Sequence, residues 1–82
     1  MNATAPDVIV YVTPLCGPCE RLKNYLRSRG VAFEVKDLMM DEAAATFLED
    51  RNIRTTPVLQ VGDEILAGVR LKTDNIDALL GL

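Results

Sequence analysis

The spacing of hydrophobic and polar positions changes several times along the chain, and the first two changes predict a strand followed by a helix. Val8–Val12 is a continuous apolar run rich in β-branched residues, which is typical of a strand buried on both faces. After a short loop, Leu22 and Leu26 recur at helical spacing. We therefore expect a helix from about Gly17 to Arg29, closed by Gly30 in the left-handed conformation.

The next stretch predicts a second strand and a second helix. Residues 32–37, AFEVKD, alternate apolar and polar positions, which indicates a half-buried strand with Phe33 and Val35 facing inward. A crossover helix of about a dozen residues between two strands favours a parallel pair. Asp41 is a suitable N-cap for the second helix, which we expect to end near Asn52.

The last third of the chain predicts a hairpin and a final helix. PVLQV and EILAG are two strand-like stretches joined by Gly62-Asp63, a typical tight turn of an antiparallel hairpin. A helix fits residues 74–80, with Asp74 as N-cap and Asp77 reaching back to it. The order β-α-β-α-β-β-α predicts an α/β fold with a four-stranded mixed sheet flanked by helices.

Length and composition narrow the class of protein. Eighty-two residues predict one domain spanning residues 1–82, and the apolar content of 49% is that of a globular chain. No apolar run is long enough to span a membrane, and the start, MNATAPD, lacks the regions of a signal peptide, so we expect a soluble, cytoplasmic protein. The net charge of −3 argues against a nucleic-acid partner.

The only two cysteines, Cys16 and Cys19, are the candidate chemistry. A zinc or iron–sulfur site normally takes four Cys or His ligands, and this chain has no histidine, so only a dimer could complete one. A structural disulfide closing so short a loop would remove little unfolded-state entropy. A thiol–disulfide redox couple is favoured, and a dithiolate metal carrier, for example for copper(I), or a dimer-bridged iron–sulfur protein stays open as the alternative.

The predicted start of the first helix explains how the cysteines could react without a histidine base. Cys16 is expected at or just before the N-cap, where free backbone N–H groups and the helix dipole favour a thiolate. Cys19 lies one turn further along on the same side and is expected to be less exposed, so Cys16 should attack and Cys19 should resolve. Pro18 suits a helix start, and Gly17 leaves room for a partner chain.

A second signal is RTTPV, which places Pro57 at the start of a predicted strand. A cis Thr56–Pro57 bond would leave the backbone beside Thr56 unpaired and free to bind an extended thiol substrate next to Cys16. An ordinary trans proline that opens a strand is the alternative.

Together, VYVTPLCGPC, RTTPV and the order of elements resemble the thioredoxin superfamily and, within it, the glutaredoxin-like redoxins, from Val8 to Leu80. The resemblance implies a thioredoxin-like fold, Cys16 as nucleophile, Cys19 as resolving thiol and Pro57 as the cis-proline. It also implies a monomeric thiol–disulfide oxidoreductase without a cofactor in the polypeptide, acting on protein disulfides.

Some positions differ from those with which glutaredoxins hold glutathione. Thr13 and Pro18 stand where many of them carry a lysine and an aromatic residue, and the usual Gly-Gly step is reduced to Gly68, with Asp74 further on. The AGVR stretch is similar to that of the hydrogen-donor redoxins of ribonucleotide reductase, so the implied electron donor is glutathione or thioredoxin reductase. The substrate-binding residues implied by the resemblance are Thr13, Pro14, Gly17, Pro18, Thr56, Pro57, Gly68 and Asp74.

Overall fold

The order of elements predicted from the sequence is confirmed in the computed structural model, which describes residues 7–82. The stretch MNATAPD, which we expect not to be a signal peptide, lies largely outside the described residues. A short 3₁₀ turn, η1, precedes the last helix. The elements are β1 (Val8–Val12), α1 (Gly17–Ser28), β2 (Glu34–Asp37), α2 (Glu42–Glu49), β3 (Val58–Val61), β4 (Glu64–Ala67), η1 (Gly68–Arg70) and α3 (Thr73–Leu80).

The sheet is mixed, as expected, with the strand order β2-β1-β3-β4. β1 pairs in parallel with β2 and antiparallel with β3, and β3 and β4 form the antiparallel hairpin. β1 therefore lies inside the sheet with partners on both sides, which accounts for its unbroken apolar sequence. The hairpin turns at Gly62, whose φ of +59° is open to glycine at no steric penalty.

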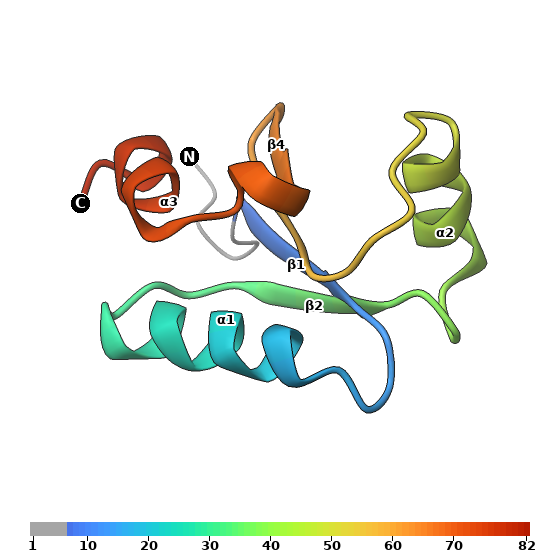
Figure 1. The fold of residues 1–82 in the computed structure, drawn as a ribbon, viewed down its shortest axis with the longest axis horizontal. Coiled ribbons are helices and arrows are strands. Elements are labelled where there is room, and N and C mark those ends of the chain that lie inside the picture. The colour runs from blue at the N-terminus through green and yellow to red at the C-terminus, as the bar shows by residue number, and fades with distance from the viewer. Residues whose placement is uncertain (1–6) are drawn as a thin grey trace.

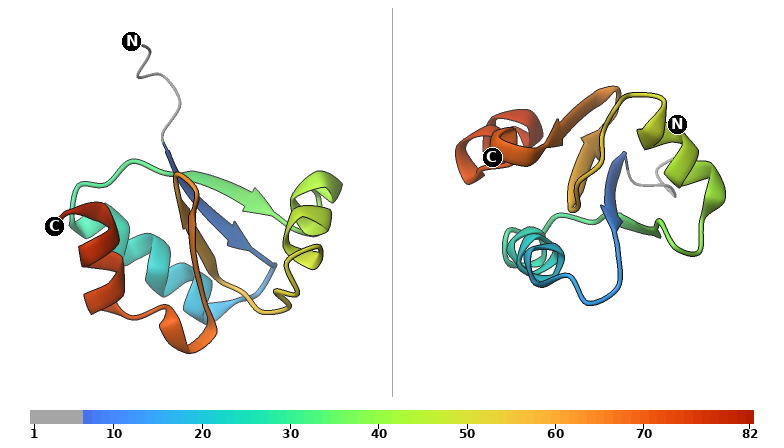
Figure 2. Two further views of the ribbon diagram at one scale, coloured as in Figure 1. Left: turned by 90° about the horizontal axis from the view of Figure 1, so that it is seen from above. Right: turned by 45° about the vertical axis from the view of Figure 1, so that its right-hand side comes forward.

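Helices cover both faces of the sheet, with α1 and α3 on one face and α2 on the other (Figures 1 and 2). The larger core cluster joins β1 to α1 and α3, and the smaller one joins β1 and β3 to α2. Alternate residues of β1 serve the two faces, because Val10 belongs to the first cluster and Tyr11 to the second. Both clusters are apolar, and together they fix β1 between the two helical layers.

Two strand and helix expectations need correction. The alternating pattern predicts that Val35 faces inward, but its side chain is 42% exposed, because β2 is an edge strand and has a neighbouring strand on one side only. The second helix begins after Asp41 as predicted but ends at Glu49 rather than near Asn52. Asn52 adopts φ +59°, and the N–H of Ile53 bonds the carbonyl of Leu48 in a Schellman-type end.

The predicted capping of the last helix is wrong. α3 has Lys72 as N-cap, without a side-chain hydrogen bond, and Asp74 is an exposed residue of the first turn. Asp77 does not reach back to Asp74, because its carboxylate accepts hydrogen bonds from the Tyr25 hydroxyl of α1 and from the guanidinium of Arg29, the C-cap of α1. Within residues 7–82, none of the helices has the length and apolarity needed to cross a membrane.

Candidate redox-active site

Cys16 is the N-cap of α1, so its sulfur lies at the positive end of the helix dipole. Its backbone is extended, with φ −107° and ψ 103°, and Sγ accepts a hydrogen bond from the backbone N–H of Cys19 at 3.1 Å. Pro18 occupies the first turn, where a missing N–H leaves no helical bond unmade. The sequence expectation for the start of this helix is therefore confirmed.

Cys16 and Cys19 form a disulfide, with their Cα atoms 5.2 Å apart. The two sulfurs differ in access. Cys19 is 1% exposed and belongs to the core cluster of β1, α1 and α3, whereas Cys16 is half-buried at its edge. A disulfide or thiol partner can therefore approach Cys16 but not Cys19, which agrees with the expected difference in exposure.

The loop before β3 lies against Cys16. The Thr56–Pro57 peptide bond is cis, as the cis alternative expected, and Pro57 is buried. The hydroxyl of Thr56 is 3.9 Å from Cys16 Sγ and 2.9 Å from the hydroxyl of Thr13, which follows β1. Segments that are 40 residues apart in the sequence thus meet at the disulfide.

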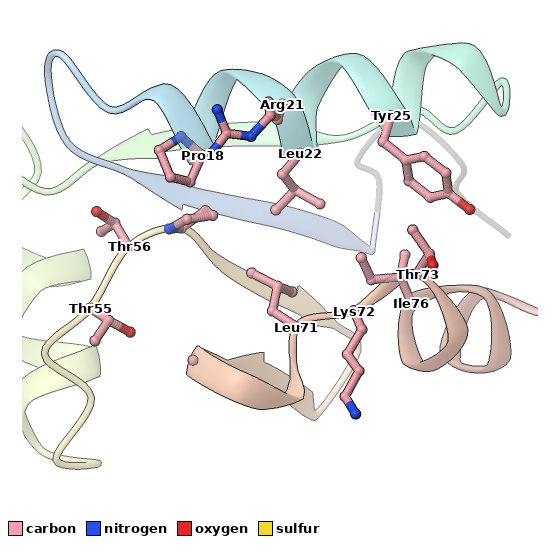
Figure 3. Close-up of a pocket in the computed structure, with 12 residues that line it drawn as sticks. Pro18, Arg21, Leu22, Tyr25, Thr55, Thr56, Leu71, Lys72, Thr73 and Ile76 are labelled. Carbon is pink, nitrogen blue, oxygen red and sulfur yellow. The ribbon is translucent and has the colours of Figure 1, made fainter.

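A groove of about 570 Å³ runs from the start of α1 toward α3, and the cis-proline loop forms one of its walls (Figure 3). Pro18, Arg21, Leu22 and Tyr25 line it from α1, Leu71 lines it from the segment before α3, and Ile76 lines it from α3 itself. The complete lining is Pro18, Arg21, Leu22, Tyr25, Thr55, Thr56, Pro57, Gly68, Leu71, Lys72, Thr73 and Ile76. Its walls are mostly apolar, with the two cationic side chains at their margins (Figure 3).

A hydrogen-bonded cluster joins α1 to α3 at the far end of this groove. The Tyr25 hydroxyl donates to Asp77 Oδ1 at 2.5 Å, and Arg29 donates to the Tyr25 oxygen at 2.9 Å and to Asp77 Oδ2 at 3.3 Å. The hydrogen bond to Asp77, with a smaller contribution from burial, raises the pKa of Tyr25. The cluster holds the aromatic ring that forms the end wall.

The described residues contain neither a buried charge nor a cluster of metal-binding side chains. No charged side chain among residues 7–82 is buried, and no group of three or more His, Cys, Asp and Glu residues in that part of the chain could hold a metal ion. The chemistry available at the site is therefore that of the sulfur pair, the helix end and two threonine hydroxyls.

The structure brings most of the predicted substrate-binding residues together. Pro18, Thr56, Pro57 and Gly68 line the groove, whereas Thr13 lines a second cavity and is hydrogen-bonded to Thr56. Pro14 and Gly17 flank Cys16 in the sequence and are exposed. Asp74 is not among the groove-lining residues, although it directly follows Thr73, which is.

The apolar walls of the groove are not predicted by the sequence pattern. From their helical spacing, Leu22, Tyr25 and Ile76 are predicted only to face the core. The spacing does not tell which inward-facing residues line a groove that is open to solvent. Leu71 and Lys72 precede a helix, and nothing in the local sequence predicts that they line a groove. A groove of this kind requires knowledge of how α1 and α3 lie beside each other.

The comparisons with known proteins decide the family. The family model described as Glutaredoxin matches residues 8–66, which include both cysteines and the cis-proline. This chain belongs to the glutaredoxin family. Gene 56 protein of Mycobacterium phage D29 is 30% identical to this redoxin over 81 residues, covering 98% of this chain and 89% of that protein.

Solved structures agree with the fold of this redoxin. The thioredoxin-like protein BC3987 superimposes with a TM-score of 0.77 at 32% identity, covering 88% of this chain and 97% of its own. NrdH-redoxin from Escherichia coli, a glutaredoxin-like protein, gives 0.74 at 27% identity, covering 92% of each chain. The fold is thioredoxin-like, and a Cys-x-x-Cys disulfide in this family is consistent with thiol–disulfide redox activity.

Proposed function

We propose that this redoxin reduces protein disulfides through a mixed disulfide on Cys16 that Cys19 resolves. The observation that carries the proposal is the unequal access of the two bonded sulfurs at the start of α1. Cys16 has the helix end and a bond from the Cys19 N–H to stabilise a thiolate, and it is the sulfur that a partner can reach. Cys19 is bonded to Cys16 in the oxidised protein, so its sulfur is in position to attack Cys16 Sγ.

The reaction proceeds in two exchanges. The Cys16 thiolate attacks one sulfur of the substrate disulfide, so the substrate S–S bond breaks, a Cys16–substrate bond forms and the first substrate thiolate leaves. Cys19 then gives up its proton and attacks Cys16 Sγ, which releases the second substrate sulfur as a thiolate. One of the two released thiolates takes up the proton of Cys19. Two electrons have passed to the substrate, and the Cys16–Cys19 disulfide must be reduced by an external dithiol or flavoenzyme.

The groove supplies a binding surface for the substrate segment beside its disulfide. Its apolar walls suit the side chains that flank a cysteine, while the chain around the Thr56–Pro57 bond offers backbone groups to an extended segment. Gly17 has no side chain to obstruct an approach to Cys16, and the space beside it is open up to the end of Arg21, which is 3.5 Å from where a Cβ would stand. All these parts come from one chain, which supports action as a monomer.

We further propose that thioredoxin reductase, rather than glutathione, is the electron donor. Thr13 and Pro18 replace the lysine and aromatic residue with which many glutaredoxins hold glutathione, and Asp74 lies outside the groove lining. NrdH-redoxin from Escherichia coli is described as having a thioredoxin-like activity profile, which favours the same profile here. A dithiol that acts as a reductant must itself be kept reduced, which supports the proposal of a cytoplasmic location.

A two-arm turnover assay tests both parts of the proposal. Oxidised protein is supplied with insulin as substrate and with either thioredoxin reductase or glutathione plus glutathione reductase, and NADPH consumption is followed. We expect faster turnover in the thioredoxin reductase arm and none with Cys16→Ser. NADPH consumption no faster in either arm than in the same arm without the protein would refute the oxidoreductase function. Faster turnover with glutathione would refute only the choice of donor.

A further inference from the structure

Thr13 and Thr56 face each other because the antiparallel pairing of β1 and β3 continues past the end of the strands. Tyr11 pairs with Val58, so two steps further in the same register Thr13 comes opposite Thr56. Their hydroxyl oxygens are 2.9 Å apart, and both side chains are half-buried. Thr56 Oγ1 is in turn 3.9 Å from Cys16 Sγ, the outer limit for a hydrogen bond to sulfur. The three atoms form a short chain that ends at the nucleophile.

When Cys16 is reduced, the number of protons available decides which hydroxyl donates in the two hydrogen bonds that link Thr13, Thr56 and Cys16. A thiolate can only accept hydrogen bonds, and each threonine hydroxyl carries one proton and two lone pairs. If Thr56 donated to Thr13, it would turn a lone pair toward the negative sulfur. If Thr13 donates to Thr56, the Thr56 proton is free to point at Cys16 Sγ, and each bond in the chain polarises the next.

We propose that Thr13 is a positioning residue that donates to the Thr56 hydroxyl and thereby orients the Thr56 proton toward the Cys16 thiolate. The inference deepens the proposed function, because it concerns the reactivity of the same sulfur. It assigns Thr13 a task beyond substrate binding, although its own oxygen has no hydrogen bond to Cys16 among the described residues. Thr56 touches the reacting atom, and Thr13 acts through Thr56.

Charged groups do not take over this task. Arg21 of α1 and Lys72 of the segment before α3 line the groove, whereas Glu49 at the end of α2 and Arg54 line a second cavity on the side of Thr13. Among residues 7–82, none of these four donates to or accepts from Cys16 Sγ, whose partners are the Cys19 N–H and the Thr56 hydroxyl. The threonine pair therefore supplies the side-chain part of the stabilisation of the thiolate.

The experiment measures the pH dependence of thiolate formation at Cys16. The rate of iodoacetamide alkylation of the fully reduced protein is followed against pH, and mass spectrometry locates the adduct on Cys16. Thr13→Val keeps the shape of the side chain but removes the donor, so the pKa of Cys16 should rise. A net hydrogen bond corresponds to an equilibrium factor of about two to ten, so the alkylation rate below the midpoint should fall by that factor. Thr13→Ser should restore the wild-type profile.

Three comparisons separate this role from a merely structural one. Thr56→Val should raise the midpoint at least as much as Thr13→Val, and the double variant should be no further shifted than Thr56→Val, because Thr13 acts through Thr56. Thr46→Val, on the exposed side of α2, is the matched control and should leave the profile unchanged. In a glutathione redox buffer at a pH above both midpoints, Thr13→Val should favour the oxidised form over wild type by the same factor.

The proposal is overturned if Thr13→Val titrates like the Thr46→Val control, or if the effects of the two threonine variants add fully. Should Thr56→Val fail to fold, as shown by circular dichroism, the difference in midpoint between Thr13→Val and Thr13→Ser decides whether the proposal holds. The alkylation measurement does not depend on turnover of a substrate. A protein that fails in the insulin assay but shows the Thr13 effect would refute the proposed function and leave this inference standing.

Discussion

Replacing the buried sulfur of Cys19 with oxygen should convert a transient intermediate into a stable product. In Cys19→Ser, Cys16 keeps its place at the start of α1 and can still attack a disulfide. The variant lacks the thiol that would displace the substrate from Cys16. A serine hydroxyl at neutral pH does not replace a thiolate as nucleophile toward sulfur. The mixed disulfide between Cys16 and the substrate should therefore accumulate.

The geometry sets the size of this effect. The two sulfurs are bonded in the oxidised protein, and α1 fixes the Cα atoms 5.2 Å apart, so resolution requires no rearrangement of the chain. Well-oriented intramolecular groups reach effective concentrations of about 10⁵ M or more, and even ~1 M would exceed 1 mM external thiol by ~10³-fold. The mixed disulfide should thus persist about a thousand times longer in Cys19→Ser than in wild type.

Folding does not obscure this result. A hydroxyl at a position that is 1% exposed and surrounded by apolar side chains destabilises by about 1–3 kcal/mol. Domains are stable by roughly 0.05–0.15 kcal/mol per residue, which leaves a margin for an 82-residue chain. Cys19→Ala avoids the buried hydroxyl and serves as a second variant with the same expected trapping.

The assay follows the adduct by mass. The reduced variant is mixed with a peptide disulfide, samples are quenched with acid at increasing times, and intact-mass spectrometry quantifies the mixed disulfide, which Cys16→Ser should not form. An adduct on Cys19→Ser and Cys19→Ala that decays at the wild-type rate would mean that another group resolves it. The division of roles between the two cysteines would then be wrong.

Three further predictions concern stability. Leu26→Ala removes a fully buried side chain of α1 and should destabilise by about 2–5 kcal/mol in urea unfolding, whereas Val35→Ala on the exposed edge strand should change stability by less than about 1 kcal/mol. Asp41→Ala removes the oxygen that accepts from the Ala44 N–H and should destabilise by about 0.5–2 kcal/mol, with no change in Cys16 alkylation as the check on specificity. Because the folded-state pKa of Tyr25 is raised, its contribution to stability is present below the ordinary value of about 10 and is lost as pH rises through the folded-state value. Unfolding midpoints measured across that range should fall less steeply in Tyr25→Phe than in wild type, and parallel curves would contradict the role given to the Asp77 bond.

Local patterns in the sequence were sufficient for most of the fold. The buried strand, the hairpin turn at Gly62 and the helix that starts beside Cys16 each carry a signal contained within a few residues. The same holds for the chemistry at the disulfide, since N-cap position and the spacing of two cysteines are local properties. The family resemblance added the cis bond before Pro57, which spacing alone left undecided.

Features that depend on contacts between distant elements could not be predicted. Asp74 and Asp77 fit a capping box by spacing, but the Tyr25 hydroxyl lies across from Asp77 once α3 packs beside α1, and this contact takes the carboxylate. Val35 fits a half-buried strand by alternation, but its exposure depends on whether β2 lies at the edge of the sheet. In each case the local pattern permits two outcomes, and tertiary packing selects one.

The geometry of the redox-active site follows from the same packing that stabilises the sheet. Val10 and its partner Leu59 belong to the core cluster under α1 and α3, while Tyr11 and Val58 belong to the cluster under α2. A slip of β3 by one residue would exchange these faces and place side chains of each set in the wrong layer, so the hydrophobic pattern holds the register firmly. That register also brings the ends of the two strands together at Cys16. The residues that fix the distance between the sulfur and the neighbouring hydroxyls are therefore buried core residues, which do not touch a substrate.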